Sequence, residues 1–212
     1  METSRVEAFS DGVFAIAITL LILAVGVDQA RASGSLSHQL LHLWPAYIAY
    51  AVSFITVGIM WVNHHQIFRH FAGADRILLL LNTLLLMAIS FTPFSTRVVA
   101  EFAHTDSDRR AAALLYGINF TITAIFFFAL WIYGSRRLLR PDADLREVSG
   151  ITRSYLPGAP IYATATLLAV ASPTASLIMF GAIAAFYAIS SAVFGRSDET
   201  AERMASVGEP SA

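Results

Sequence analysis

Four side chains able to carry charge or bridge helices lie within, or at the edge of, long apolar segments. Asp11 directly precedes the run GVFAIAITLLILAVGV, His64 and His65 lie in WVNHHQIF, and Asn82 interrupts LLLLNTLLLM. A carboxylate or imidazole in such surroundings is costly unless it is paired, so it usually has both a partner and a function. A carboxylate near imidazoles can hold a metal ion, relay protons or anchor one helix to another.

The partners available to Asp11 follow from helical spacing. In the second apolar segment, Trp61, His64 and His65 share one face at i, i+3 and i+4, at the same membrane depth as Asp11. We therefore expect an interhelical network that joins Asp11 to Trp61 or to one of the histidines. Arg5 is a further candidate, although it and Asp11 point in different directions on a continuous helix.

Three roles remain open for the two histidines. They can form structural hydrogen bonds, or they can gate or sense pH, because histidine titrates near neutrality. Metal binding or catalysis is the third role, but adjacent histidines point about 100° apart on a helix and no HExxH spacing is present. Asn82 can bridge helices through its amide.

The first apolar segment carries a second pattern. Counting about 100° per residue, Ile16, Thr19, Leu20 and Leu23 share one stripe, and Asp11 lies on the opposite side. The stripe would suit a pore-lining helix closed by apolar rings, while Asp11 would face helices of its own chain. Ordinary packing of the stripe against another helix or lipid is the other interpretation.

The composition is that of a membrane protein. Of the 212 residues, 56% are hydrophobic and 14% are charged, against roughly 45–50% and about 25% in soluble domains. The absence of cysteine excludes disulfides and thiolate chemistry. A formal net charge of −1 gives no reason to expect nucleic acid as a partner.

Six segments approach the length of about 20 apolar residues that spans a bilayer. They are 9–27, 44–68, 75–99, 110–134, 156–172 and 174–194. We therefore predict an all-α polytopic membrane protein with six transmembrane helices, formed by a single domain over 1–195. A polar tail over 196–212 is predicted to be disordered.

Prolines and capping residues mark the expected helix boundaries. Pro45 suits the first turn of the second segment, and Asp75 suits the cap of the third. Pro93 predicts a kink, and Pro173 predicts a tight break between the last two segments. The fifth segment begins in a proline-rich stretch, so we expect it to be short or partly re-entrant.

The arginines predict the orientation. With the N-terminus in the cytoplasm, ten of the fourteen arginines fall on the cytoplasmic side. This bias favours a topology with both termini in the cytoplasm, and we expect the protein in the cell membrane. The arginine-rich stretch 135–153 is most simply a loop that faces lipid headgroups. It could bind anionic lipid, but its interspersed acidic residues weaken that interpretation.

The motif Arg5-x-x-x-Phe9-Ser10-Asp11, followed by GVFAIAITLL, resembles the signature of prokaryotic relatives of transmembrane protein 175, the endosomal and lysosomal potassium channel. The stretches Trp61-x-x-His64-His65 and LNTLLLMAISFTPF resemble the same family. The similarity covers 1 to about 195. It implies one six-helix repeat per chain and a homotetramer, whereas the animal proteins fuse two repeats and dimerise.

This resemblance implies a potassium-permeable channel in the membrane lipid, not an enzyme, with permeant K⁺ and no cofactor. The first helix of each subunit would line the pore, without a TVGYG-type filter. By motif position, Ile16 would form the narrowest ring, Leu20 and Leu23 the next rings, and Thr19 a ring of hydroxyls.

The resemblance also implies a structural network that holds the pore helix. Its members would be Arg5, Phe9, Ser10, Asp11, Trp61, His64, His65 and Asn82. The alternative function is a proton-coupled secondary transporter with Asp11 and His64 as a relay. A membrane enzyme is a third class, but no set of base, nucleophile and metal ligands can be assembled for it.

Overall fold

The computed structural model describes residues 2–26, 35–102 and 106–189 of the chain. Within these ranges the regular structure is helical, apart from one isolated antiparallel bridge between Phe71 and Leu139. The predicted tail and the far ends of the first and sixth predicted segments lie outside the described residues. The domain boundary at 195 therefore stays a prediction.

The helices follow one another along the chain. They are α1 (Thr3–Leu20), the 3₁₀ turn η1 (Leu21–Ala24), α2 (Leu36–His42), α3 (Trp44–Phe68), α4 (Arg76–Ser90), α5 (Thr92–Phe102), α6 (Asp106–Arg137), α7 (Leu145–Tyr155) and α8 (Gly158–Ala171). A last apolar helix covers Pro173–Ile189. By length and composition, four units can cross a membrane: α1 with η1, α3, α4 with α5, and α6. The chain is thus an all-α polytopic membrane protein.

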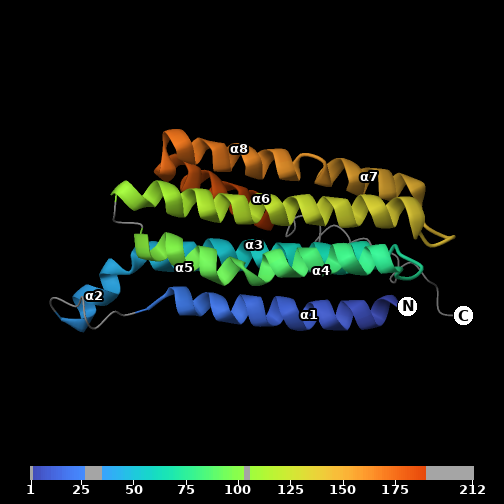
Figure 1. Ribbon diagram of the computed structural model, residues 1–212, viewed down its shortest axis with the longest axis horizontal. Coiled ribbons are helices and arrows are strands. Elements are labelled where there is room, and N and C mark those ends of the chain that lie inside the picture. Colours follow the sequence, from blue (N-terminus) through green and yellow to red (C-terminus); the bar gives the residue numbers. More distant parts are fainter. Residues whose placement is uncertain (1, 27–34, 103–105, 190–212) are drawn as a thin grey trace, which may run out of the picture.

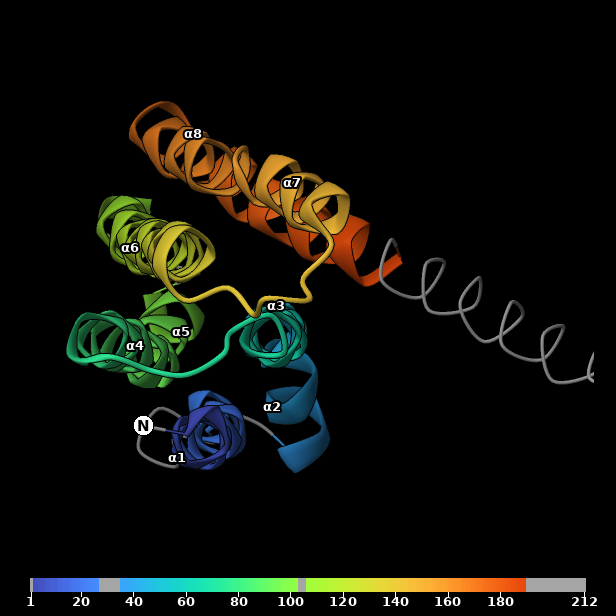
Figure 2. The ribbon, with the colours of Figure 1, turned by 90° about the vertical axis from the view of Figure 1, so that its right-hand side faces the viewer.

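The long helices lie side by side along one axis (Figure 1). Viewed end on, α1 lies at one edge of the bundle, and α7 and α8 lie at the opposite edge (Figure 2). Between these edges, α1 packs on α3 and α4, while α6 packs on α4, α5 and α8. The edge position of α1 leaves much of its surface uncovered in a single chain.

The helix boundaries have local causes. Pro45 lies in the first turn of α3, where its missing N–H is not needed. The Asp75 carboxylate caps α4 by accepting from the Leu78 N–H at 2.8 Å, and it also accepts from the Tyr133 hydroxyl. These bonds hold the pKa of Asp75 below its usual range. The third predicted segment breaks between α4 and α5, just before Pro93.

Two short helices were not predicted. α2 lies in a connection, and most of α7 lies in the stretch 135–153, for which we predicted a loop. The sequence did not predict α7 because this helix is too short and too polar to be found from the length of apolar runs. Its 3.6-residue periodicity is nevertheless clear, since Val148, Ile151 and Tyr155 pack against the core and Asp144 caps its start.

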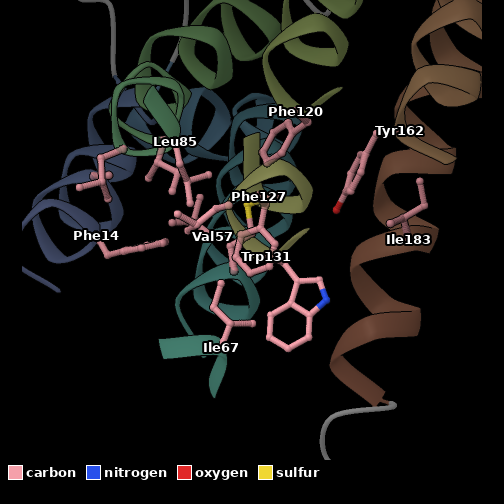
Figure 3. Close-up of a cluster of buried hydrophobic side chains, with 14 of the residues drawn as sticks. Phe14, Val57, Ile67, Leu85, Phe120, Phe127, Trp131, Tyr162 and Ile183 are labelled. Carbon is pink, nitrogen blue, oxygen red and sulfur yellow. The ribbon is translucent and has the colours of Figure 1, made fainter. Parts of the chain in front are cut away.

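The buried core has two parts joined by α6 (Figure 3). Phe14, Val57 and Leu85 fill the space between α1, α3 and α4. On the other side of α6, Tyr162 of α8 faces the last helix. Trp131 of α6 is fully buried near the end of the helix. A continuous core thus fixes the position of α3 and α4, against which α1 rests.

A close contact holds the end of α3 on α6. The Ala72 N–H donates to the Leu138 carbonyl at 2.8 Å, and the Arg140 N–H donates to the His70 carbonyl at 3.0 Å. These bonds bring the Phe71 ring directly over Gly134, where a side chain would leave no room. A Cβ atom at Gly134 would lie 2.1 Å from the Phe71 Cζ atom.

We therefore expect Gly134→Ala to displace Phe71 and to lower the free energy of unfolding by about 1–3 kcal/mol. Gly58→Ala is the matched control, because a Cβ there meets nothing within 4 Å and alanine favours the helix. Thermal unfolding in detergent measures both. Equal midpoints for the two variants would contradict the proposed packing.

Candidate functional site

α1 packs on the rest of the chain through one face. Val6, Ser10, Phe14, Ala17 and Leu21 are buried and recur at intervals of three or four residues. This spacing is that of a helix stripe facing a core. The buried face is turned toward α3 and α4, which α1 contacts along its length. The rotation of α1 about its axis is therefore set, and the opposite face has no packing role in the single chain.

The four residues predicted to line a pore lie on that uncovered side. Ile16 is 62% exposed, Leu20 is 42% exposed and Leu23 is 63% exposed. Thr19 is also exposed, and its hydroxyl donates to the Ile16 carbonyl at 2.9 Å. The stripe therefore consists of bulky aliphatic side chains, and its one hydroxyl is bonded to its own helix.

A buried chain of hydrogen bonds joins α1 to α4 and α3. His64 Nε2 donates to Asn82 Oδ1 at 2.8 Å, and Asn82 Nδ2 donates to Ser10 Oγ at 2.9 Å. Ser10 Oγ in turn donates to the Val6 carbonyl at 2.8 Å. Phe14 and Phe68 pack against the His64 ring with centroids 5.4 and 4.5 Å away. Asn82 is thus the bridge between the pore-helix candidate and the histidine.

Asp11 forms a separate contact at the edge of this network. Its Oδ1 accepts from Trp61 Nε1 at 2.8 Å. His65, the neighbour of His64, points toward Glu7, and its Nδ1 atom lies 3.4 Å from Glu7 Oε2. Glu7 was not predicted as a site residue, although its position one turn before Asp11 could have suggested it. The two adjacent histidines therefore contact different partners on α1 and α4.

Two residues of the predicted network lie apart from it. Phe9 is 64% exposed, and Arg5 is also exposed. Within the part of the chain that the structure describes, Arg5 forms no hydrogen bond or ion pair, so no Arg5–Asp11 pair is present. Both side chains lie on the same uncovered side of α1 as Ile16, seven and eleven residues earlier.

This geometry limits the chemistry of the site. Asp11 and His64 are bonded to different residues, so the two ends of the suggested proton relay are not joined directly. Among the described residues, no group of three His, Asp or Glu side chains could hold a metal ion. The contacts of Ser10, Asp11 and Asn82 instead tie one helix to two others.

A second buried polar network was missed by the sequence analysis. Thr96 Oγ1 donates to Ser53 Oγ at 2.8 Å, and Ser53 Oγ lies 3.0 Å from the Tyr116 hydroxyl. Asn119 Nδ2 donates to Thr92 Oγ1 at 3.1 Å, directly after the break between α4 and α5. The spacing of hydroxyls in TPFST was the available signal. This network fastens α5 to α3 and α6.

Comparisons with known proteins identify the family in which this arrangement occurs. A family model described as the endosomal/lysosomal potassium channel TMEM175 matches residues 5–93. The chain is 42% identical over 188 residues to a potassium channel of Streptomyces collinus, covering 88% of this chain and 91% of that protein. It is 36% identical over 154 residues to the endosomal/lysosomal proton channel TMEM175 of Gallus gallus, covering 68% of this chain and 31% of that protein.

Solved structures agree with this. The crystal structure of a lysosomal potassium-selective channel TMEM175 homologue from Chamaesiphon minutus matches with a TM-score of 0.82 and 40% identity, covering 89% of this chain and 97% of that chain. A variant of the potassium channel MtTMEM175, 20% identical, shares the fold with a TM-score of 0.60 and covers 92% and 93% of the two chains.

Fold and similarity together define the class as a polytopic membrane protein of a channel family rather than an enzyme. More specifically, the chain belongs to the TMEM175 family.

The bridge through Asn82 makes a direct prediction. Asn82→Leu removes the acceptor of His64 and the donor to Ser10, so it should lower the free energy of unfolding by roughly 1–3 kcal/mol. The neighbouring Thr83→Val is the matched control, because the exposed Thr83 hydroxyl bonds only within its own helix. Thermal unfolding of both variants tests the bridge, and a midpoint for Asn82→Leu as high as that of the control would refute it.

Proposed function

We propose that this protein is a potassium-permeable channel whose central pore is lined by α1 of each subunit. The observation that carries the proposal is the uncovered stripe of Ile16, Leu20 and Leu23, opposite the face of α1 that packs within the chain. The sequence that carries this stripe is 42% identical to that of a potassium channel from Streptomyces collinus and to that of another from Chamaesiphon minutus. An exposed aliphatic stripe on an edge helix suits a surface shared with further copies.

A central pore lined by α1 requires an oligomer, and we propose a homotetramer. One helix per chain cannot enclose a pore, whereas several copies related by rotational symmetry can. The position of α1 at the edge of the bundle favours such an arrangement (Figure 2). α8 and Pro173–Ile189 would complete six membrane-crossing helices per chain, because both are apolar and α8 packs on α6.

The gate in this proposal is hydrophobic. Four Ile16 side chains around the axis would form a narrow apolar ring, which excludes water and stops ions. Leu20 and Leu23 would form further rings, and Thr19 would add a hydroxyl ring near the constriction. Opening would require the α1 helices to separate or rotate, because the aliphatic side chains cannot themselves coordinate a cation.

The polar contacts of α1 would hold the gate in register. Ser10 and Asp11 are bonded to α4 and α3, respectively, six and five residues before Ile16. Because Asn82 is buried and Asp11 begins a long apolar run, breaking either contact removes the partner of a polar group. The network would therefore resist rotation of α1 at its amino-terminal end.

Potassium is the proposed permeant ion, with only modest preference over sodium in the absence of a carbonyl filter. The chain covers 91% and 95% of the length of two bacterial relatives, which are named potassium channels. The animal relatives are named proton channels. A transporter using Asp11 and His64 as a relay is less well supported, because the two side chains are bonded to different partners.

The proposed location is the cell membrane, with both termini in the cytoplasm. The end of the bundle that carries the N-terminus also carries the ends of α3 and α6 and helix α7 (Figure 1). Most of the described arginines lie at that end, whereas Arg97, Arg109 and Arg110 lie near the other. This distribution is the one expected for cytoplasmic loops.

The gate is tested by substitution on the stripe. Ile16→Asn and Ile16→Ala should raise potassium flux several-fold in reconstituted liposomes, because a smaller or more polar ring holds water. Ile22→Ala is the matched control, since Ile22 is 51% exposed but lies outside the stripe. Flux of K⁺ and Na⁺ should be compared for each variant. Unchanged flux in both Ile16 variants would exclude Ile16 as the constriction.

The anchor is tested at Asp11. Asp11→Ala should reduce the yield of assembled tetramer, because Trp61 loses its acceptor, whereas Asp11→Asn keeps an oxygen acceptor and should assemble better. Native mass spectrometry measures the assembly state of each purified variant. A stable tetramer with normal flux for Asp11→Ala would show that this contact does not hold the pore helix.

A further inference from the structure

The outer face of α7 carries an uncovered pair of arginines. Arg146 and Arg153 are seven residues apart, so they lie on one stripe of the helix, and both are exposed. Gly150 lies between them, and a Cβ atom built there meets nothing within 4 Å. Leu145 and Leu156 flank this stripe and are 72% and 59% exposed. The face therefore combines two cations, an open centre and two exposed aliphatic side chains.

The acidic residues of the same stretch are engaged elsewhere. Glu147 Oε1 lies 3.3 Å from His70 Nε2, and Asp142 Oδ1 lies 3.3 Å from Arg140 Nε. Asp144 caps α7 by accepting from a backbone N–H at 2.8 Å. Within the part of the chain that the structure describes, Arg146 and Arg153 form no ion pair. In the sequence, these acidic residues weakened the case for binding anionic lipid. In the structure they contact other groups, so the outer face of α7 is positively charged.

The opposite face of α7 is held firmly on α6. Trp131 Nε1 donates to Thr152 Oγ1 at 2.9 Å, and the Tyr155 ring meets the Trp131 and Phe127 rings edge to face at 6.1 and 5.3 Å. Burial raises the pKa of the Tyr155 hydroxyl, so it remains neutral. These contacts fix which face of α7 points outward.

The position of α7 places that face at the level of lipid headgroups. α7 lies beside the last turns of α6 (Figure 1), a helix long and apolar enough to cross the membrane. Those last turns carry Arg136 and Arg137, which mark the end of the apolar part. At this depth the outer face of α7 meets the boundary between headgroups and acyl chains. It is also on the edge of the bundle away from α1, so the proposed pore does not cover it (Figure 2).

We propose that Arg146 and Arg153 bind the headgroup phosphate of an anionic phospholipid, with Leu145 and Leu156 resting on its acyl chains. Guanidinium groups bind phosphate oxygens through paired hydrogen bonds, and the open surface at Gly150 admits the headgroup between them. Aliphatic side chains beside a basic stripe are the composition of a helix that lies in the membrane interface. The proposal rests on the membrane position of α6 but not on the pore or its ion selectivity.

The test compares phosphatidylglycerol with phosphatidylcholine in nanodiscs that hold the full chain. Phosphatidylglycerol should raise the thermal-unfolding midpoint of the unaltered protein, and native mass spectrometry should retain bound phosphatidylglycerol. Arg146→Gln/Arg153→Gln should lose most of both effects, with affinity falling roughly fivefold for each arginine removed. Arg146→Lys/Arg153→Lys should retain most of the midpoint shift, because the positive charges remain.

The single variant Arg153→Gln should lose part of the phosphatidylglycerol effect. Its matched control is Arg140→Gln, which removes one arginine of the same stretch, but one that already pairs with Asp142. It should leave the phosphatidylglycerol effect nearly intact, and all variants should unfold alike in phosphatidylcholine. A full effect in the double glutamine variant, or none in the unaltered protein, would overturn the proposal. An equal shift from soluble glycerol 3-phosphate would also overturn it, by showing a phosphate site that needs no lipid.

Discussion

The structure depends on one constraint: a polar group among apolar helices must find its hydrogen-bond partner inside the protein. Asn82 satisfies this constraint for two neighbours at once, because it accepts from His64 and donates to Ser10. Both bonds are directional, so they fix the rotation of α1 relative to α3 and α4. The side of α1 that remains uncovered therefore follows from the polar bridge together with the buried apolar stripe of the helix.

The bridge in turn requires that α3 and α4 be held in place. The end of α3 is fastened to α6 through the bonds between the segments at Ala72 and Leu138 and through the close fit of Phe71 over Gly134. α4 is capped by Asp75, whose second oxygen accepts from Tyr133 of α6. α6 thus acts as the frame of the bundle, with α1 on one side and the α7–α8 pair on the other.

The two edges of the bundle suit different surroundings. The uncovered stripe of α1 is aliphatic, which suits a dry contact or a closed pore between subunits. The outer face of α7 is positive with aliphatic flanks, which suits the membrane interface. Because α6 separates the two edges, a lipid bound at α7 and an ion path at α1 would lie on opposite sides of the same frame.

The sequence by itself determined the all-α membrane class, the positions of the long helices and the two sides of α1. These follow from apolar run length, proline positions and helical periodicity, which are local properties. The sequence also singled out Asp11, Trp61, His64 and Asn82, since polar groups in apolar runs are conspicuous. Only the tertiary structure decided which of them meet: Asp11 bonds Trp61, while His64 bonds Asn82. Pairing between helices depends on their relative depth and rotation, and a single helix does not encode either.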